Sequence, residues 1–284
     1  MTAPIISVII PTYDRRHVID RSVDSVLRQE MDRFELIVVD DGSTDGTAEY
    51  LAKKYDDPRV RMIVQENAGV CVARNTGVEA ASCGFVTFLD SDDEACPGWL
   101  AFYASAIDSE HQLASCALHW VGPGSLYSVR APERMGRAFG DLHALFLPGA
   151  FGLEKSLLHE VGGFRPGLRF SEHTDLALRL GGLMLDRPFR AMHLDEPFVT
   201  FHREERPYDP ALQYESSMTL LREDMVHLER SPKLLATYLG IAGVAASKLG
   251  RHDESRRLLA RAIRSHPLWA KNYLRLAREM AFGR

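Results

Sequence analysis

The sequence predicts an α/β protein whose sheet is flanked by helices, followed by a smaller region made only of helices. Three observations support this fold class. Short apolar runs of strand length alternate with amphipathic helical patterns over residues 5–89. Acidic side chains directly follow the second and the fourth of those runs. Beyond Pro210 the apolar spacing is helical down to the end of the chain.

Four strands are expected in the first third of the chain. They cover the apolar runs Ile5–Ile10, Phe34–Val39, Val60–Val64 and Phe85–Leu89. The helices expected between them cover 18–27, 48–55 and 69–81, and Ser43 or Thr44 is the expected cap of the second. Strands that alternate with helices form right-handed units with a parallel sheet.

The middle of the chain, residues 100–150, is expected to be irregular. Proline and glycine interrupt it repeatedly, at Pro123, Gly124, Pro132, Gly136, Gly140, Pro148 and Gly149. After this part, helices are expected over Leu153–Val161 and Glu172–Gly181.

The C-terminal region resembles one tetratricopeptide repeat. The resemblance rests on the spacing of Gly243, Ser255, Ala262 and Pro267, and a further helix over Trp269–Met280 would cover the hairpin. A single repeat cannot bury its own apolar face, so it must pack on the first domain or on a second subunit as a homodimer. We therefore expect one domain over 1–208, with halves 1–108 and 109–208, and a helical region over 209–284.

Composition and charge narrow the function classes. With 284 residues, 45% hydrophobic and 26% charged, the chain has the composition of an ordinary soluble globular protein. Its formal net charge of -5 argues against general nucleic-acid binding. Arginine is concentrated beyond residue 250 and could contact a membrane face peripherally, although a solvated helix face is the simpler interpretation.

Cysteine usage and hydropathy indicate a cytoplasmic protein. Cys71, Cys83, Cys96 and Cys116 form no CxxC pair, which is typical of reduced thiols rather than of a disulfide framework or a zinc site. No apolar run approaches the roughly 18 residues of a transmembrane segment. The N-terminus shows no pattern of a signal peptide.

The acidic residues that follow the strands predict a metal site. Ligands of parallel sheets bind beyond the carboxyl ends of the strands, where Asp40–Asp41 and Asp90–Asp92 are expected. Asp90 and Asp92 are alternate residues of an extended segment, so both can face one ion. Their oxygen ligands suit Mg²⁺ or Mn²⁺. On Asp-x-Asp alone, an acidic turn that ends the strand and caps the next helix is the simpler interpretation.

Four motifs in the same order carry a resemblance to a known family. They are Ile9–Tyr13, Val38–Thr47, Asn67–Asn75 and Phe88–Asp93. Together they resemble family 2 of the inverting glycosyltransferases, and the likeness continues more loosely to about residue 205. The resemblance implies the GT-A fold, a Rossmann-like nucleotide-binding half and an acceptor-binding half in one mixed sheet. It also implies metal-dependent transfer of a sugar from a nucleotide diphosphate sugar, most often a UDP-sugar.

The resemblance also implies roles for individual residues. The nucleotide-binding residues would be Pro11, Thr12, Tyr13, Asp41, Arg74, Asp90 and Ser91. Among them, Pro11 and Tyr13 would line the base pocket and Asp41 would accept a hydrogen bond from the base. Asp92 would be the principal metal ligand, with Asp90 near it. His202 is a candidate for a further ligand, although a structural or exposed histidine is the simpler interpretation.

The expected general base departs from the family pattern. Relatives usually carry Glu-Asp at this position, where this chain has Glu172-His173. A histidine titrates near neutral pH and can take the proton of an acceptor hydroxyl, so His173 is the expected base. Two alternatives stay open. Glu172 or Asp175 could serve instead, or the site could be catalytically weak.

Other function classes are less favoured or stay open. No G-x-G-x-x-G follows the first expected strand, which disfavours a dinucleotide-dependent oxidoreductase. No glycine-rich loop containing arginine follows it either, which disfavours a sugar-nucleotide pyrophosphorylase. A non-catalytic module that binds a nucleotide and uses its helical tail for interactions remains the rival from another class. The acceptor could be a glycan, a lipid-linked oligosaccharide or a peptide.

Overall fold

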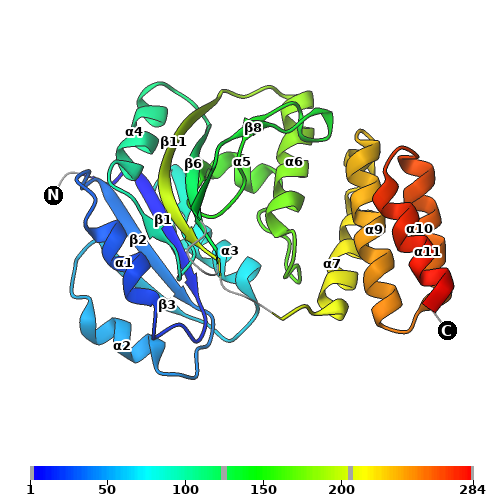
Figure 1. The fold of residues 1–284 in the computed structure, drawn as a ribbon. Coiled ribbons are helices and arrows are strands. Elements are labelled where there is room, and N and C mark those ends of the chain that lie inside the picture. Colours follow the sequence, from blue (N-terminus) through cyan, green and yellow to red (C-terminus); the bar gives the residue numbers. More distant parts are fainter. Residues whose placement is uncertain (1–2, 123–126, 204–206, 283–284) are drawn as a thin grey trace. The chain divides into compact units, whose positions relative to one another are not determined.

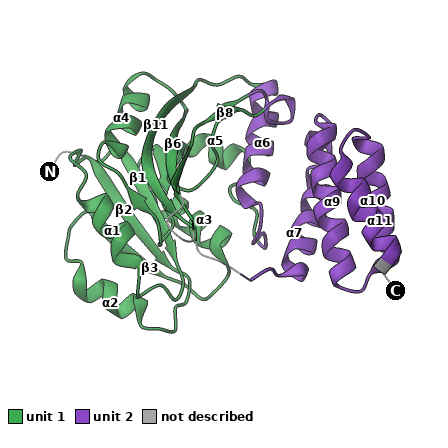
Figure 2. Cartoon of the chain, in the orientation of Figure 1, with its two compact units in different colours: residues 1–135, 142–166, 186–205 green, residues 136–141, 167–185, 206–284 purple. Residues whose placement is uncertain are grey.

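The protein is described by a computed structural model that covers residues 3–122, 127–203 and 207–282. Its segments form two compact units (Figure 2). Unit 1 comprises Met1–Met135, Leu142–Pro166 and Asp186–Glu205, and unit 2 comprises Gly136–Asp141, Gly167–Leu185 and Arg206–Arg284. Unit 2 therefore joins two short segments of the earlier chain to the C-terminal helices.

Unit 1 is built on a nine-stranded mixed sheet with helices on both sides (Figure 1). Its strands are β1 (Ile6–Thr12), β2 (Phe34–Asp40), β3 (Val60–Val64), β4 (Phe85–Phe88), β5 (Glu94–Ala95), β6 (Leu113–Val121), β7 (Tyr127–Arg130), β10 (Phe151–Glu154) and β11 (Ala191–His202). Their order is β3-β2-β1-β4-β10-β6-β11-β5, with β7 paired to β6. A separate short pair is formed by β8 (Glu133–Arg134) and β9 (His143–Ala144).

The first four strands of the sheet align their carboxyl ends at one edge. All seven residues of β1 are buried, as expected for a strand covered on both faces. β1 runs parallel to β2 and to β4, and Thr12 at its end lies opposite Asp40 at the end of β2. The predicted parallel arrangement is confirmed here. The sheet becomes mixed at β10, which is antiparallel to β4 and to β6.

Along the chain, the helices of unit 1 connect successive strands. They are α1 (Ile19–Leu27), α2 (Thr47–Lys54), α3 (Val70–Ala80), α4 (Trp99–Asp108) and α5 (Lys155–Glu160). α4 anchors the middle of the chain, because the Trp99 indole and the Tyr103 hydroxyl both donate hydrogen bonds to the Gly149 carbonyl, at 2.7 and 2.9 Å. Both aromatic side chains are fully buried.

The prediction of irregular structure over 100–150 was wrong for its first part. α4 and the nine-residue strand β6 occupy most of residues 99–121. β6 starts with the buried run Leu113–Leu118, which pairs with β10 on one edge and with β11 on the other. The small residues of this run gave only a weak apolar pattern, so the sequence did not predict the strand. The proline and glycine breaks come later, and Pro123 and Gly124 lie outside the described residues.

Two local predictions also need correction. Neither Ser43 nor Thr44 caps α2, because the helix begins at Thr47 behind Gly46, whose φ is +80°. The Ser43 hydroxyl instead accepts a hydrogen bond from the Asp14 backbone N–H at 2.9 Å. The helix expected from Leu153 is shorter than predicted, because Leu153 still belongs to β10, and α5 begins only at Lys155.

Unit 2 is helical in its described residues. It contains the short 3₁₀ turn η2 (Arg137–Phe139), α6 (Glu172–Asp186), α7 (Pro210–Glu223), α8 (Met225–Leu228), α9 (Pro232–Lys248), α10 (His252–Ser265) and α11 (Ala270–Phe282). The predicted helices of the C-terminal region are confirmed, and α6 extends beyond Gly181. Gly243 on α9 allows the close approach of α10, because a Cβ there would lie 2.8 Å from the Leu259 side chain. α11 leaves Leu274 and Met280 exposed, and dimerisation through these helices stays a prediction.

Two further findings concern the cysteines and the hydropathy of the helices. All four cysteines are free thiols. Across the described ranges, no helix combines the length and the hydropathy needed to cross a membrane.

Candidate active site

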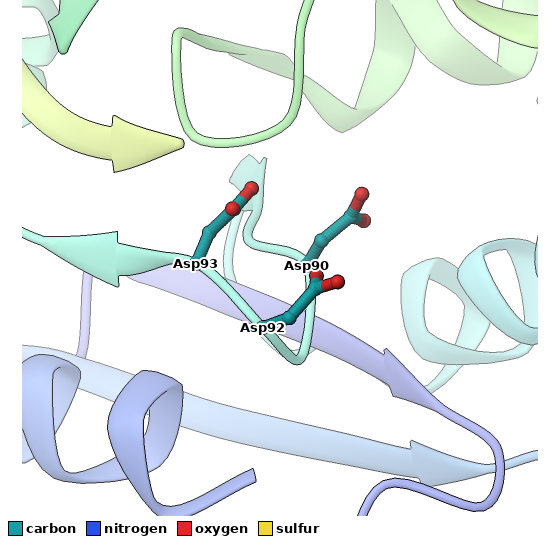
Figure 3. Close-up of side chains that lie close together, drawn as sticks. All are labelled: Asp90, Asp92 and Asp93. Atoms are coloured by element: carbon teal, nitrogen blue, oxygen red, sulfur yellow. The ribbon is translucent and has the colours of Figure 1, made fainter. Parts of the chain in front are cut away.

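Three aspartates converge on the turn between β4 and β5. Asp90, Asp92 and Asp93 each offer a carboxylate oxygen within 4.8 Å of the others (Figure 3). The turn lies at the carboxyl end of β4, which is the edge of the sheet where the sequence predicts ligand binding. Asp93 completes the cluster beside the two predicted residues.

Asp93 is the most enclosed of the three. It is 1% exposed, and its Oδ1 accepts a hydrogen bond from the His202 backbone N–H at 2.8 Å. Its Oδ2 is buried without a hydrogen-bond partner among the described residues. Burial, and then the charges of Asp90 and Asp92, hold the pKa of the Asp93 carboxyl well above its ordinary value. The cluster therefore has a buried oxygen that is ready to accept a proton or a cation.

Arginines compensate part of the negative charge. Arg74 is buried and its Nη2 lies 2.8 Å from Asp90 Oδ1, while its guanidinium stacks over the Phe164 ring at 5.2 Å. Arg15 Nη2 lies 3.8 Å from Asp92 Oδ2. Arg21 donates a hydrogen bond to the Asp92 carbonyl at 3.0 Å. The Arg74 guanidinium thus engages Asp90 directly, and Arg15 and Arg21 bring positive charge to Asp92.

The donor set fits a hard divalent cation. Its ligand atoms are carboxylate oxygens without a thiol, which suits Mg²⁺ or Mn²⁺. The orphaned Asp93 Oδ2 and the raised pKa of Asp93 both indicate charge that a cation would neutralise. Asp92 and Asp90 remain the predicted ligands, and Asp93 is the third carboxylate available.

His202 lies beside the cluster but outside the group of converging ligand atoms. Its backbone binds Asp93, and its Nε2 is buried without a hydrogen-bond partner in the part of the chain that the structure describes. Burial, followed by the charge of Arg21, lowers the pKa of the His202 imidazole, which favours the neutral ring that metals bind. A ligand role for His202 stays a prediction.

The ends of β1 and β2 form a hydrogen-bonded edge next to the cluster. The Asp41 N–H donates to the Thr12 carbonyl at 2.8 Å, and Pro11 and Thr12 are buried in β1. Asp14, with φ +50°, accepts hydrogen bonds from the backbone of Thr44 and Asp45. Hydrogen bonds therefore join the loops that follow β1 and β2. Tyr13, in the first of these loops, is 46% exposed and available to a ligand.

Asp41 organises the loop that leads into α3. Its Oδ1 accepts from Gln65 Nε2 at 2.7 Å and from the Ala68 N–H at 2.9 Å, and its Oδ2 accepts from the Gly69 N–H at 2.8 Å. A carboxylate has about four acceptor positions, so one remains beside these three bonds. Base recognition by Asp41 stays a prediction, and its structural role is an additional one.

Asp41→Asn is expected to lower the free energy of unfolding by about 1–3 kcal/mol, because an amide leaves the Gly69 or Ala68 N–H without an acceptor. Urea unfolding measures the change. Glu66→Gln is the matched control, because it removes the same charge from an exposed residue of the loop that leads into α3. Equal stability of the two variants would contradict the structural role of Asp41.

The three candidate catalytic residues share the first turn of α6 in unit 2. Ser171, directly before the helix, has φ +63°, a left-handed conformation that is rare outside glycine. His173 Nδ1 lies 3.3 Å from Glu172 Oε1, and both side chains are largely buried. Asp175 is fully buried and its Oδ2 accepts a hydrogen bond from Arg179 Nε at 3.1 Å. The geometry therefore pairs His173 with Glu172, while Asp175 is paired with Arg179.

Sequence reasoning missed several residues of this region. Asp93 followed the predicted pair directly, and its acidic side chain was the available indication. Arg15, Arg21 and Gln65 carried no such indication, because their contacts join segments that are 24 to 77 residues apart in the chain.

Comparison with known proteins places the chain in a family. The profile described as "Glycosyl transferase family 2" matches residues 7–172. An uncharacterised glycosyltransferase of Escherichia coli (strain K12), YibD, is 37% identical over 119 residues, which are 40% of this chain and 34% of that protein. The Escherichia coli protein "UDP-Glc:alpha-D-GlcNAc-diphosphoundecaprenol beta-1,3-glucosyltransferase WfgD" is 41% identical over 90 residues, 31% of this chain and 35% of that protein.

The fold has a solved counterpart. The crystal structure of S. aureus TarS 1-349 in complex with UDP-GlcNAc superposes with a TM-score of 0.66 at 20% identity, covering 98% of this chain and 87% of that one. This likeness confirms the GT-A fold. The sequence matches to the two relatives above span about a third of their lengths. Since the family profile matches more than half of the residues of this chain, the chain belongs to glycosyl transferase family 2.

Proposed function

We propose that the protein is a metal-dependent inverting glycosyltransferase that moves a sugar from a nucleotide diphosphate sugar to an acceptor hydroxyl. The observation that carries the proposal is the convergence of Asp90, Asp92 and Asp93 at the carboxyl edge of the sheet, within the residues that match the family. Carboxylate oxygens suit a cation that holds a diphosphate, and ligands of such sheets bind beyond the carboxyl ends of the strands.

The nucleotide would bind along the ends of β1 and β2. Pro11, Thr12 and Tyr13 would face the base, with the remaining acceptor position of Asp41 for its N–H group. Arg74 and Ser91 would lie near the diphosphate or ribose. UDP is the expected nucleotide, and the names of two similar proteins support it, since WfgD is called a UDP-Glc transferase and TarS was solved with UDP-GlcNAc.

Asp92, with Asp90 and Asp93 nearby and His202 as a further candidate, would hold the Mg²⁺ or Mn²⁺ ion. Such an ion supplies positive charge to a diphosphate leaving group, an effect of several kcal/mol. The chain's own contribution is to fix the carboxylates, through the Arg74–Asp90 pair and the hydrogen bond from His202 to Asp93.

The reaction would be one in-line displacement. The acceptor oxygen forms a bond to the anomeric carbon while the bond from that carbon to the diphosphate oxygen breaks, and the electron pair leaves with the nucleoside diphosphate. The acceptor proton passes to a base, which we assign to His173. With its Nδ1 directed at Glu172, a neutral imidazole would accept the proton at Nε2.

The acceptor is proposed only by class. A hydroxyl of a glycan, a lipid-linked oligosaccharide or a peptide would serve, in the biosynthesis of a surface polysaccharide or another glycoconjugate. The name of WfgD describes a lipid-linked acceptor for that relative.

A nucleotide panel tests the first step. We expect UDP with Mn²⁺ or Mg²⁺ to raise the melting temperature by mass action, and a chelator to abolish most of that shift. GDP, TDP and CDP with the same ions are the matched ligands, and smaller shifts are expected for them. Thermal unfolding in each condition measures the effect.

The same panel separates the rival interpretation. No shift with any nucleotide and ion would remove the first step of the transferase and favour a non-catalytic interaction module. A shift that persists unchanged in chelator would contradict metal dependence while leaving nucleotide binding in place.

A further inference from the structure

A cavity of about 570 Å³ lies among the last three helices of unit 2. These helices are the orange and red part of the ribbon in Figure 1. The side chains around the cavity come from α9, α10 and α11, and they are Val244, Ser247, Lys248, His252, Ser255, Leu259, Arg275, Arg278 and Glu279. Its volume falls in the range of sites for small ligands.

Glu279 is the one carboxylate among the described lining residues, and neighbouring side chains already bind both of its oxygens. Glu279 is 4% exposed, its Oε2 accepts a hydrogen bond from Ser247, and its Oε1 lies 2.7 Å from His252 Nδ1. Burial acts to raise the pKa of Glu279, but these hydrogen bonds bring it below its ordinary value. Glu279 is therefore an ionised internal link between the three helices.

The lining also holds three cations, Lys248, Arg275 and Arg278. Among the described residues, no carboxylate lies within ion-pair distance of Lys248, Arg275 or Arg278. Arg275 is partly buried and donates a hydrogen bond to the neutral Asn272 amide oxygen at 3.0 Å. The Lys248 ammonium lies 3.8 Å from the centre of the Tyr208 ring. With His252 neutral, the lining carries a net charge of +2.

A second observation points to a missing polar partner. Ser255 lines the cavity and is fully buried, and its Oγ has no hydrogen-bond partner within the described ranges. A buried hydroxyl without a partner is costly, and a ligand oxygen could satisfy it. Within the described residues, the cavity thus combines three cations that lack a carboxylate partner with a hydroxyl that lacks a hydrogen-bond partner.

We propose that this cavity binds an anionic group of the acceptor, namely a carboxylate or a phosphate carried on a sugar chain. Guanidinium and ammonium groups recognise both anions through charge-assisted hydrogen bonds. His252 is the one aromatic side chain among the described lining residues, and its ring is held by Glu279. No Phe, Tyr or Trp of this lining offers a base a stacking surface, which argues against a single-stranded nucleic acid. That the ligand is the acceptor rests on the proposed function, whereas the anion site rests on the cavity itself.

Direct binding to the full chain tests the site. The probes are an oligogalacturonate as the carboxylate source, a phosphorylated mannan oligosaccharide as the phosphate source, and a neutral dextran oligomer of equal length. We expect calorimetric titration to show binding of at least one anionic probe, weakening with added salt, and no binding of dextran.

Variants locate the binding. Lys248→Gln/Arg275→Gln is expected to weaken anion binding about tenfold or more. Lys248→Gln/Arg278→Gln changes two exposed residues and guards against a folding defect from Arg275. The matched control, Arg257→Gln/Arg264→Gln, removes two exposed cations that do not line the cavity and should change affinity less than about twofold.

Three results would overturn the proposal. They are the absence of binding by either anionic probe, equal weakening in the cavity and control variants, and tighter binding of a single-stranded oligodeoxynucleotide than of both glycans. The nucleotide panel is run on the same variants. If UDP raises the melting temperature but no anionic probe binds, only the anion site is rejected. If UDP does not raise the melting temperature of the unaltered chain, the proposed transferase is rejected instead.

Discussion

Asp92→Asn is expected to lower the rate of sugar transfer by about 10³-fold, because loss of the principal metal ligand removes several kcal/mol of charge stabilisation at the diphosphate. The same change should abolish the metal-dependent part of the UDP thermal shift. The fold should survive, because the Asp92 side chain lies in a turn at the edge of the sheet, where Arg15 Nη2 is 3.8 Å from its Oδ2, and asparagine keeps its size and shape.

Asp92 is a sharper test than its neighbours. Asp90→Asn would leave the buried Arg74 guanidinium without its carboxylate, so lost activity could reflect lost stability. Asp93→Asn would alter a buried group that also holds the His202 backbone. Asp92→Asn removes a charge at the cluster with the least disturbance of these contacts.

The measurement is a transfer assay with a UDP-sugar over a Mn²⁺ titration, together with thermal unfolding in UDP and Mn²⁺. Glu94→Gln is the matched control, since it neutralises a partly exposed acid two residues later, beyond the cluster. Turnover by Asp92→Asn within tenfold of the unaltered protein, with an unchanged response to the ion, would reject Asp92 as the principal ligand.

The sequence predicted the part of the fold that local patterns encode. Val8, Leu36 and Val86 lie in continuous apolar runs, and these runs became the buried parallel strands β1, β2 and β4. The acidic residues that end β2 and follow β4 then had to meet at one edge, because parallel strands share their direction. The edge of the sheet that carries Asp41, Asp90 and Asp92 could therefore be predicted from the sequence, whereas the contribution of Asp93 to the cluster came from the structure.

The remainder depended on contacts between distant segments. β10 pairs antiparallel with β4, from which it is separated by more than 60 residues along the chain. The residue pattern of 151–154 does not indicate which strand is its partner. The hydrogen bonds from Gln65 and Gly69 to Asp41 and the grouping of 136–141 with the C-terminal helices likewise depend on the folded chain. Local patterns specify where a strand runs, whereas its antiparallel partner follows from packing.

The assignment of the base gives the last prediction. His173→Ala is expected to lower transfer by about 10²–10⁴-fold, the usual contribution of a general base, while the UDP thermal shift stays unchanged. Glu172→Gln should have a smaller effect, because the imidazole loses an orienting partner 3.3 Å away but keeps its proton acceptor. Transfer rates with saturating donor measure both, and His159→Ala, at a half-exposed histidine of α5, is the control.

A replacement that restores a base makes the assignment specific. His173→Asp should recover part of the activity lost in His173→Ala, and the acidic limb of its pH–rate profile should move to lower pH, because an aspartate ordinarily loses its proton at lower pH than a histidine. If Glu172→Gln abolishes transfer and His173→Ala does not, the base is the carboxylate. His173 would then serve to hold Glu172, since the two side chains face each other in the first turn of α6.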